Sequence, residues 1–353
     1  MNVIAIGDQH FKVDNIPDVE LFINRITNLV EKKKPDFVVL LGDLLDTHER
    51  LHTIPLNKAY EFINNIRKVS KTYILTGNHD MVNHLQFLTN NHWLNYLKEW
   101  TNVVVVDNVV LEVINNKKFV FVPYVEPGRF LEALNTLEEE WADADCIFAH
   151  QEFHGCKMGA IVSLEGDKWP EDYPNIVSGH IHNNQKPQKN IYYPGSSIQI
   201  AFGENQDNII ASLTFKEDEK DYELEEIDLK LPKKKIIYTN IEDVEKIDIE
   251  RTDDKIKISV CGDHNEYKTF KKTKKYKELV SKGAKVIFKP KKIETQIKNE
   301  NLKKVIENNT TDLTNFKKII TELVAEKEDS YLYEVFELIV NNNKIKSDDI
   351  LFL

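Results

Sequence analysis

Short apolar segments alternate with longer amphipathic segments over the first half of the chain. The short segments are rich in β-branched and aromatic residues, which predicts strands at residues 2–6, 36–41, 72–76, 103–106, 119–122, 146–149 and 176–178. Apolar residues recur with helical spacing between them, which predicts helices at residues 19–33, 56–69, 85–100 and 128–141. This alternation predicts an α/β fold of stacked sheets with helices on the outside.

The pattern changes near residue 209. Short alternating segments at 210–215, 222–228 and 255–260 predict a small second domain rich in strands. Towards the C-terminus, apolar side chains form two helical stripes: Phe316, Ile319, Ile320, Leu323 and Val324, then Leu332, Val335, Phe336, Ile339 and Val340. We therefore expect one domain at residues 1–208, a smaller α+β domain at 209–292 and a helical tail at 293–353.

Side chains that can bind a metal stand directly after five of the predicted strands. The motifs are Asp8-Gln9-His10, Gly42-Asp43, Gly77-Asn78-His79-Asp80, His150 and Gly179-His180-Ile181-His182. Because the carboxyl ends of strands in an α/β fold open into one crevice, these motifs can converge. In extended backbone, residues i and i+2 point the same way, so each of the two pairs Asp8/His10 and His180/His182 can grip one ion. One such histidine alone is more often structural, but the whole set favours a functional site.

The charges of these residues suit a pair of divalent ions. Two such ions bring four positive charges, and Asp8 and Asp43 bring two negative ones, so one hydroxide and one phosphodiester would balance the site. Mixed carboxylate, imidazole and amide ligands suit Mn²⁺, Fe²⁺ or Zn²⁺ better than Ca²⁺. Two ions about 3.5–4 Å apart lower the pKa of a water and hold a phosphoryl group. The sequence therefore predicts hydrolysis of a phosphoester.

The motif set resembles that of the calcineurin-like metallophosphoesterases, which carry D-x-H, G-D, G-N-H-[DE], H and G-H-x-H. Within that family it most resembles the DNA-repair nuclease subunits, which include bacterial SbcD, the phage recombination endonuclease subunit and the eukaryotic double-strand-break nuclease. The cues are the segments 42–46 (GDLLD), 123–125 (PYV), 149–153 (AHQEF) and 193–196 (YPGS). The resemblance covers residues 1–205 and implies an αββα sandwich of two mixed sheets with a smaller capping domain.

The resemblance also implies a role for each motif residue. The implied ligands serve two ions bridged by Asp43: Asp8, His10 and His182 for the first, and Asn78, His150 and His180 for the second. The ions would be Mn²⁺, with Fe²⁺, Zn²⁺ or Mg²⁺ as alternatives. His79 would act on the scissile phosphate as an acid or a cation, and Asp80 would orient its ring. Some nucleases of this group have a second catalytic histidine where this chain has Asp46, so none is expected there, and His48 and His52 are given no role.

The resemblance implies DNA as the substrate and two protein partners. Members of this nuclease group act as 3′–5′ exonucleases and endonucleases in double-strand-break repair or recombination, as homodimers bound to a coiled-coil ATPase of the SMC type. The two apolar stripes of the tail either dock on that ATPase or pack on each other. We expect the dimer surface on the predicted helix 85–100, with Phe87, Trp93 and Leu94 exposed.

A lysine-rich segment in the second domain is a candidate DNA contact. Residues 268–292 contain 11 lysines and one acidic residue, Glu278. The segment either neutralises DNA phosphates, through Lys271, Lys272, Lys274 and Lys275, or forms a solvated face. The net charge of the chain is −11, the wrong sign for a protein that binds nucleic acid unaided. A DNA substrate would therefore require local basic patches, metal ions or a partner.

Cysteine use and hydropathy indicate the compartment. The three cysteines, Cys146, Cys156 and Cys261, are odd in number and form no CxxC pair, which favours a reducing compartment. We find neither a signal peptide nor an apolar run long enough for a membrane helix. We therefore expect a cytoplasmic protein, in the host cell if its source is viral or phage, as its Asn-, Lys- and Ile-rich composition suggests.

Two other functions remain open from the sequence. The same metal motifs would serve a calcineurin-like phosphatase or phosphodiesterase acting on a protein, nucleotide or other small phosphoester. The chain could also be a scaffold that keeps the fold without the chemistry, although every expected ligand is present. The second domain, the lysine-rich segment and the helical tail favour the nuclease, because a simple phosphatase needs none of them.

Overall fold

The computed structural model describes residues 1–217 and 219–291. These contain two six-stranded sheets, a three-stranded sheet and a two-stranded hairpin. In the first large sheet the order is β14 (Tyr222–Ile227), β13 (Ile210–Phe215), β1 (Asn2–Ile6), β2 (Phe37–Leu40), β3 (Lys71–Leu75) and β4 (Val103–Val106). Strands β1 to β4 run parallel; β13 pairs antiparallel with β1, and β14 pairs antiparallel with β13 at the edge.

The second large sheet is also mixed. Its order is β11 (Gln185–Gln188), β12 (Ile191–Tyr193), β10 (Asn175–Gly179), β7 (Cys146–His150), β6 (Lys117–Val122) and β5 (Val110–Ile114). The four central strands run parallel, and each edge strand is antiparallel to its neighbour. Both sheets therefore have a parallel centre, which is where carboxyl ends of strands collect.

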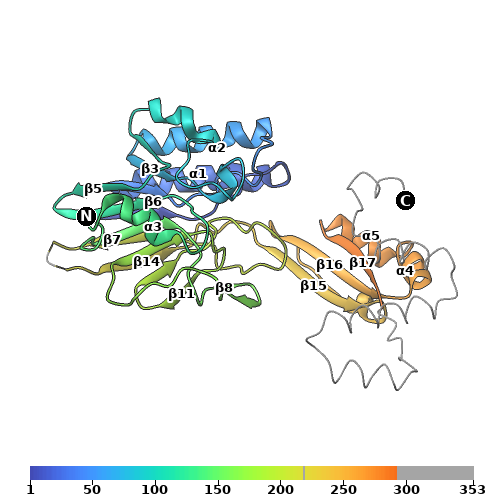
Figure 1. Cartoon of the computed structure of the whole chain (residues 1–353). Coiled ribbons are helices and arrows are strands. Elements are labelled where there is room, and N and C mark those ends of the chain that lie inside the picture. Colours follow the sequence, from blue (N-terminus) through green and yellow to red (C-terminus); the bar gives the residue numbers. More distant parts are fainter. Residues whose placement is uncertain (218, 292–353) are drawn as a thin grey trace, which may run out of the picture. The chain divides into compact units, whose positions relative to one another are not determined.

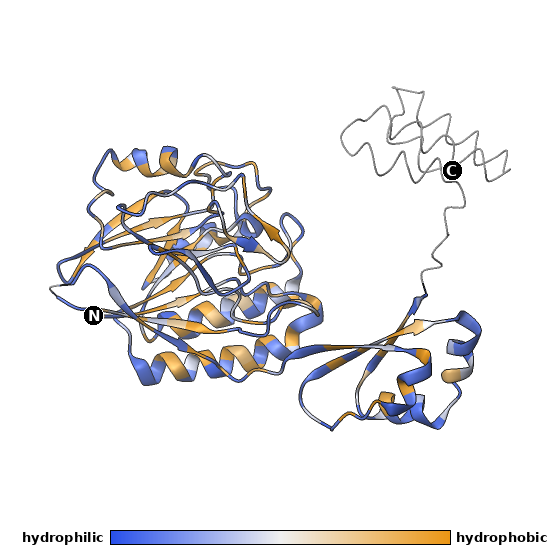
Figure 2. Ribbon diagram, turned by 90° about the horizontal axis from the view of Figure 1, so that it is seen from below, coloured by the Kyte–Doolittle hydropathy of each residue, from blue (hydrophilic) through white to orange (hydrophobic). Residues whose placement is uncertain are grey.

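Alternation along the strands produces the layers. In β1, Val3 and Ala5 face the second sheet, in a core shared with Phe121 and Phe148. Ile4 and Ile6 point to the opposite side, where they belong to a core shared with α1 (Ile16–Lys33) and α2 (Thr53–Arg67). Figure 1 shows these two helices together beside the sheet, and Figure 2 shows both hydrophilic and hydrophobic colour along their ribbons.

The outer face of the second sheet is covered by less regular structure. The core there includes Val120, Ile147 and Trp169 and is completed by α3 (Phe130–Leu134). The result is a helix–sheet–sheet–helix sandwich, which confirms the predicted fold. The short 3₁₀ turns are η1 (Val13–Asn15), η2 (Asn78–Asp80), η3 (Trp93–Glu99), η4 (Asn135–Leu137) and η5 (Ile241–Lys246). The hairpin pairs β8 (Lys157–Met158) with β9 (Ile161–Val162).

The small domain is a three-stranded parallel sheet with two helices. Its strands are β15 (Lys234–Asn240), β16 (Lys255–Gly262) and β17 (Lys285–Pro290), in that order. Helices α4 (His264–Phe270) and α5 (Lys274–Ser281) contribute Phe270 and Leu279 to a separate core. The predicted helical tail, residues 293–353, lies outside the described residues. Among the described helices, none has the length and hydropathy to cross a bilayer.

Three sequence predictions about the elements are wrong. Segments 210–215 and 222–228 were assigned to the small domain, but β13 and β14 extend the first large sheet, so the boundary at residue 208 falls too early. The helix predicted at 85–100 is only the 3₁₀ turn η3, preceded by irregular chain in which Leu88 has a φ of +44°. The helix predicted at 128–141 stops at Leu134 and continues as η4.

The supposed dimer surface on residues 85–100 is affected by the same error. Leu94 is fully buried in the core under the first sheet. Trp93 packs partly against that core and donates its indole N–H to Asp80. Phe87 lies under the guanidinium of Arg129, at 3.7 Å from the ring centroid. Leu94 is thus buried and Phe87 and Trp93 are half-buried, so these three side chains do not form the expected exposed surface. The exposed apolar side chains of this segment are Leu85 and Tyr96, and the homodimer remains a prediction.

Candidate metal centre

The carboxyl ends of five central strands bring the predicted site residues together. Asp8 and His10 follow β1, Asp43 follows β2, and Asn78, His79 and Asp80 form the turn after β3. From the second sheet, His150 is the last residue of β7, and His180 and His182 follow β10. Because β1, β2 and β3 are neighbours in one sheet, and β7 and β10 in the other, both sheets contribute to a single cluster.

The cluster contains three overlapping groups whose ligand atoms lie within 4.8 Å of one another. The groups are Asp8, His10 and His182; His10, Asp43 and His79; and Asp43, His150 and His180. Asp43 belongs to two of them, as expected for a shared carboxylate. Asn78 Oδ1 joins the last group, at 2.9 Å from His180 Nδ1 and 3.1 Å from His150 Nε2. The structure thus collects all seven predicted ligands.

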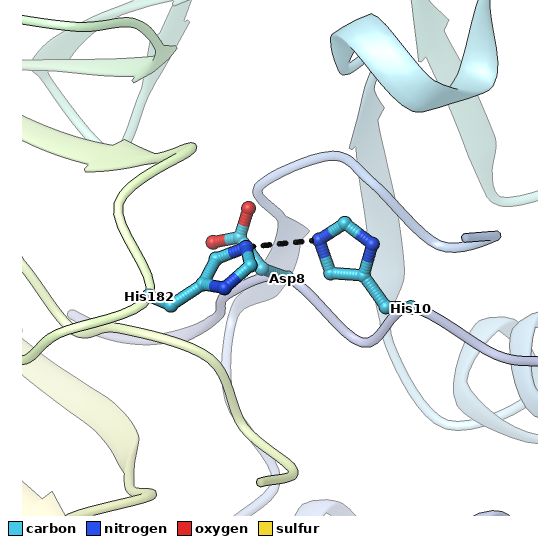
Figure 3. A group of neighbouring side chains, drawn as sticks. All are labelled: Asp8, His10 and His182. Carbon is cyan, nitrogen blue, oxygen red and sulfur yellow. Dashed lines mark hydrogen bonds between the residues drawn. The ribbon is translucent and has the colours of Figure 1, made fainter. Parts of the chain in front are cut away.

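The donor atoms fit a bound cation. Asp8 Oδ2 is buried, and it has no hydrogen-bond partner among the described residues. Figure 3 shows the rings of His10 and His182 beside this carboxylate, with their Nε2 atoms 3.1 Å apart. A buried carboxylate oxygen that lacks a donor is costly, and a metal ion would satisfy it together with both imidazoles. Such mixed nitrogen and oxygen ligands are suited to first-row transition metals.

The backbone holds four of these residues in an unfavourable conformation. Asp8, His10, Asp43 and His180 have φ values of +28°, +43°, +52° and +80°. A non-glycine residue with positive φ costs on the order of 1–3 kcal/mol, and such residues gather at functional sites. The predicted reason for the convergence of each D-x-H and H-x-H pair, extended backbone, is therefore wrong. Left-handed turns after the strands direct these side chains instead.

Two glycines make room for the cluster. A Cβ on Gly77 would lie 2.2 Å from Asp43 Oδ1, and one on Gly42 would lie 2.5 Å from His150 Nδ1. Gly42 also has a φ of +101°. The glycines of these two motifs are thus required by close packing against the ligand side chains.

Burial and mutual contact shift the titration of the cluster. Burial alone would raise the pKa of Asp43, but the charge and hydrogen bond of His150, with His10 and His79, hold it well below its usual range. Burial opposes ionisation of His150, yet Asp43 and Asp8 raise its pKa to about 9. Burial and the neighbouring His150 lower the pKa of His180 to about 3, which leaves His180 neutral with the lone pair of one ring nitrogen available.

The partner of His79 differs from the one expected. Its Nδ1 lies 2.8 Å from the backbone oxygen of Asp46, and its ring stacks on His48 with centroids 4.6 Å apart. Its backbone N–H donates to Asp43 Oδ1 at 2.8 Å. Burial lowers the pKa of the ring. His48, given no role from the sequence, thus supports the ring of His79.

Asp80 does not orient that ring. Its buried carboxylate accepts hydrogen bonds from the backbone N–H groups of Gly77, Asp43 and Leu44 and from the indole of Trp93, at 2.9–3.2 Å. Burial and the charge of Asp43 raise the pKa of Asp80 to about 6. The expectation for Asp80 is therefore corrected: it ties the Asp43 turn to the Asn78 turn, and the Asp46 carbonyl holds His79.

Glu204 is a site residue that the sequence analysis missed. Its Oε1 lies 3.5 Å from His182 Nδ1, while Oε2 accepts from the backbone N–H groups of Ile200 and Ala201 at 2.9 and 2.8 Å. The Nδ1 atom of His182 therefore lies beside the Glu204 carboxylate, and its Nε2 atom faces His10 in the cluster. The only signal was a Gly203-Glu204 pair soon after the YPGS segment, and it lies on no strand end.

The lysines proposed as DNA contacts stand apart from this cluster. Lys271 follows α4, with its ammonium 5.1 Å from the ring centroid of Tyr267, and Lys275 pairs with Glu278 at 3.4 Å on α5. Lys272 and Lys274 lie at the junction of the two helices. None of the four lines the cleft at the metal cluster. Their contact with DNA remains a prediction.

An α/β sandwich with imidazole, carboxylate and amide donors at its parallel strand ends has the organisation of a metal-dependent hydrolase. The profile of the family Calcineurin-like phosphoesterase matches residues 1–213. The chain is 50% identical over 294 residues to "Putative phosphoesterase 078R" of Invertebrate iridescent virus 3, an alignment that covers 82% of this chain and 84% of the relative.

A second viral relative and a bacterial structure are also similar. "Putative phosphoesterase 244L" of Invertebrate iridescent virus 6 is 49% identical over 277 residues, covering 77% of this chain and 98% of the relative. The solved structure of Yfce, a phosphoesterase from E. coli, is 16% identical, covers 60% of this chain and 88% of its own, and has a TM-score of 0.33. The chain belongs to the calcineurin-like phosphoesterase family, and its chemistry is hydrolysis of a phosphoester.

Proposed function

We propose that this protein is a metal-dependent DNA nuclease. It cleaves phosphodiester bonds as a 3′–5′ exonuclease and endonuclease, in double-strand-break repair or recombination. The chemistry of the proposal rests above all on His79, which lines the same cleft as the Asp43 cluster and is held there by the Asp46 carbonyl. The choice of DNA as the substrate rests on the resemblance to the repair nucleases. The GDLLD segment that supplies both Asp43 and Asp46 is one of the cues shared with the SbcD-type nucleases.

The size of the cleft is compatible with a polymer. Its volume is roughly 800 Å³, and it is lined from both sheets and from the hairpin. Asp43, Asn78, His79, His180 and His182 all reach it. A cleft of this size falls within the range of small-molecule sites, so its volume fits a short piece of a strand as well as a small phosphoester.

The residues present would hold two divalent ions, most suitably Mn²⁺. Asp8, His10 and His182 would bind one ion, Asn78, His150 and His180 the other, and Asp43 both. Bound there, the ions would lower the pKa of the attacking water and neutralise charge on the phosphoryl group. Glu204 lies 3.5 Å from His182 Nδ1, and a carboxylate on that side favours a proton on Nδ1, which leaves Nε2 as the atom that faces the metal.

His79 handles the proton of the leaving oxygen. The Asp46 carbonyl can only accept, so Nδ1 of His79 must carry a proton and Nε2 is the free position. In the protonated ring, Nε2–H donates to the leaving oxygen or stabilises its negative charge. Burial lowers the pKa of His79, so the ring is favoured as neutral until the negative charge of a bound phosphoester stabilises its protonated form.

The protein partners in this proposal come from the resemblance alone. We propose a homodimer that binds an SMC-like coiled-coil ATPase, with residues 293–353 as the segment that docks on it. The viral relatives are consistent with action in the cytoplasm of a host cell. Co-purification of the full chain with that ATPase from the same genome, lost on deletion of residues 311–353, would support this part.

One observation favours a different phosphoester. Among the described residues that line the cleft, Lys157 is the single cation, and the chain carries a net charge of −11. A polyanion such as DNA usually meets several cations. The alternative is a phosphatase or phosphodiesterase acting on a protein or small-molecule phosphoester, and the same metal cluster would serve it.

A comparison of substrates distinguishes the nuclease from the phosphatase. Purified protein with Mn²⁺ is assayed on linear duplex DNA, single-stranded DNA, p-nitrophenyl phosphate and bis(p-nitrophenyl) phosphate. The nuclease predicts cleavage of DNA and of the diester, with little turnover of the monoester. Turnover of the monoester alone would reject the nuclease in favour of the phosphatase.

A further inference from the structure

A short hairpin at the edge of the metal cleft has unusual composition. We call residues 157–162 the rim hairpin; it pairs β8 with β9 across a turn at Gly159, whose φ is +64°. Lys157, Met158 and Gly159 line the cleft that also contains His79 and His180. The hairpin is therefore a wall of the catalytic site, although none of its residues belongs to the metal cluster.

The hairpin exposes apolar side chains that contact little else. Met158, Ile161 and Val162 are 39%, 67% and 46% exposed, and Leu164 just beyond is 72% exposed. Met158 pairs with Ile161 across the strands, so their side chains share one face. Single exposed apolar residues are ordinary, but several together beside a cleft indicate a binding surface.

The base of the hairpin is fixed to the loop that carries the metal ligands. The Gln185 side chain accepts from the backbone N–H of Lys157 at 2.8 Å and donates to its carbonyl at 2.9 Å. Ser163 pairs with the backbone of Cys156 and Gly155 at 2.8 and 2.9 Å. Gln185 stands three residues after His182, so the exposed apolar face is held at a set position relative to the cluster.

The electrostatics of the cleft restrict what this surface can bind. Apart from the histidines, Lys157 is the one basic residue among the described lining residues, and Asp43 and Glu204 line the same cleft with carboxylates. Beyond the scissile phosphate, which the bound ions would hold, attraction to flanking phosphates therefore supplies little of the affinity for a nucleic acid here. The remaining source is contact with the bases: aromatic side chains stack on them at any sequence, and aliphatic side chains such as Met and Ile pack against them between base steps.

We propose that Met158 and Ile161 of the rim hairpin pack against a nucleobase next to the scissile phosphate. This inference rests on the proposed nuclease function and defines its substrate as a strand whose bases are unstacked at the site. Apolar side chains that enter a base step are a known means of unstacking duplex DNA. Lys157, on the same wall, meets the phosphate beyond that base.

The test compares two oligomers of equal length: single-stranded DNA and a chain of abasic residues with the same phosphodiester backbone. The full chain loaded with Mn²⁺ is assayed as wild type, as Met158→Ser/Ile161→Ser, and as Val113→Ser. Val113, 63% exposed on β5, is the matched control for removing an exposed aliphatic side chain. Because all three positions are exposed, folding is checked by thermal melting.

The wild type should prefer DNA over the abasic oligomer by about tenfold in kcat/KM, and the double variant should lose that preference while cutting the abasic oligomer normally. The variant Met158→Leu/Ile161→Val should keep the preference, and so should Val113→Ser. Equal losses on both oligomers, or no loss, would overturn the proposal. The proposal would also be overturned if light scattering showed a dimer for the wild type and a monomer for the Met158→Ser/Ile161→Ser variant. The rim hairpin would then be a contact between two copies of the chain.

The outcome also distinguishes this inference from the function beneath it. If the wild type cuts both oligomers equally well, the proposed contact between the hairpin and a base is rejected, but the proposed nuclease function is not. A wild type that cuts neither, yet hydrolyses p-nitrophenyl phosphate, removes the nuclease and the hairpin contact together.

Discussion

The metal centre and the small domain contain the same local sequence pattern with opposite outcomes. In both, an apolar strand ends in Gly-Asp: Gly42-Asp43 after β2 and Gly262-Asp263 after β16. Asp43 is 2% exposed, has a φ of +52° and faces His10 and His150. Asp263 is exposed, has a φ of −78° and accepts from the N–H groups of Asn265 and Glu266 as the N-cap of α4.

The difference lies in what the neighbouring strands supply. Asp43 stands between β1 and β3, whose ends carry His10 and Asn78. The strands beside β16 end at Asn240 and Pro290, and no metal-capable group of the described residues includes Asp263. A Gly-Asp pair after a strand is therefore ambiguous alone, and its function depends on convergence with residues that are distant in sequence.

The largest contrast should come from removing each aspartate. Asp43→Ala should lose bound metal and reduce diester hydrolysis by about three orders of magnitude, because Asp43 belongs to two of the three metal-capable groups. Asp263→Ala should keep full metal content and activity. Metal content by mass spectrometry and turnover of bis(p-nitrophenyl) phosphate measure both. Equal metal content in the two variants would refute the role of Asp43.

His79→Ala should separate chemistry from metal binding within the same centre. The imidazole is in the proposed proton path, so hydrolysis should fall by about 10²–10⁴-fold while metal content stays at the wild-type value. The control is His92→Ala, which removes another histidine outside the metal cluster, one whose buried side chain pairs with Asp107 at 3.1 Å. Loss of metal in the His79 variant would show that this residue is a ligand instead.

Glu204→Ala should weaken metal binding without abolishing it. Removing a carboxylate that orients a ligating histidine costs about 10–100-fold in metal affinity, measured here by calorimetric titration of the metal-free protein with Mn²⁺. Asp207→Asn, at an exposed position on the same loop, is the control. An affinity unchanged in Glu204→Ala would mean that its 3.5 Å approach to His182 has no part in holding the ion.

The smallest effect concerns the stability of the small domain. Asp263→Ala removes the cap of α4, which should lower the free energy of unfolding by about 1 kcal/mol. Asp263→Asn should retain most of it, because the amide oxygen still accepts from the helix N–H groups. Urea unfolding of the full chain measures both variants. If the Asp263 side chain does not stabilise α4, the Asp263→Ala and Asp263→Asn variants should have the same free energy of unfolding.

The sequence predicted the parts of the fold that depend on local pattern. Strands β1 to β4, β6, β7 and β10 lie at or within about two residues of their predicted positions, because each is a compact apolar run with at least one parallel neighbour. Strand β11, with the sequence Gln-Lys-Pro-Gln, gave no such signal, since an edge strand needs few apolar residues. Alternation located β13 and β14 but could not indicate which sheet they join.

The site shows the same division. Its metal-capable residues were identifiable because they follow strands, and strand ends converge in this architecture. The hydrogen bond that holds the His79 ring could not be identified from the sequence, because its acceptor is the backbone carbonyl of Asp46, which any residue type could supply. The hydrogen bonds of Asp80 and the approach of Glu204 to His182 likewise depend on how turns fold in space, which spacing along the chain does not encode.

The position of β13 beside β1 has a practical consequence for producing the protein. A fragment that stops at residue 208 would strip one side of β1, and the bare hydrogen-bonding groups of Val3 and Ala5 would invite other chains to pair there. Such a fragment should aggregate, whereas a fragment that ends after Ile227 retains β13 and β14, and β13 still pairs with β1.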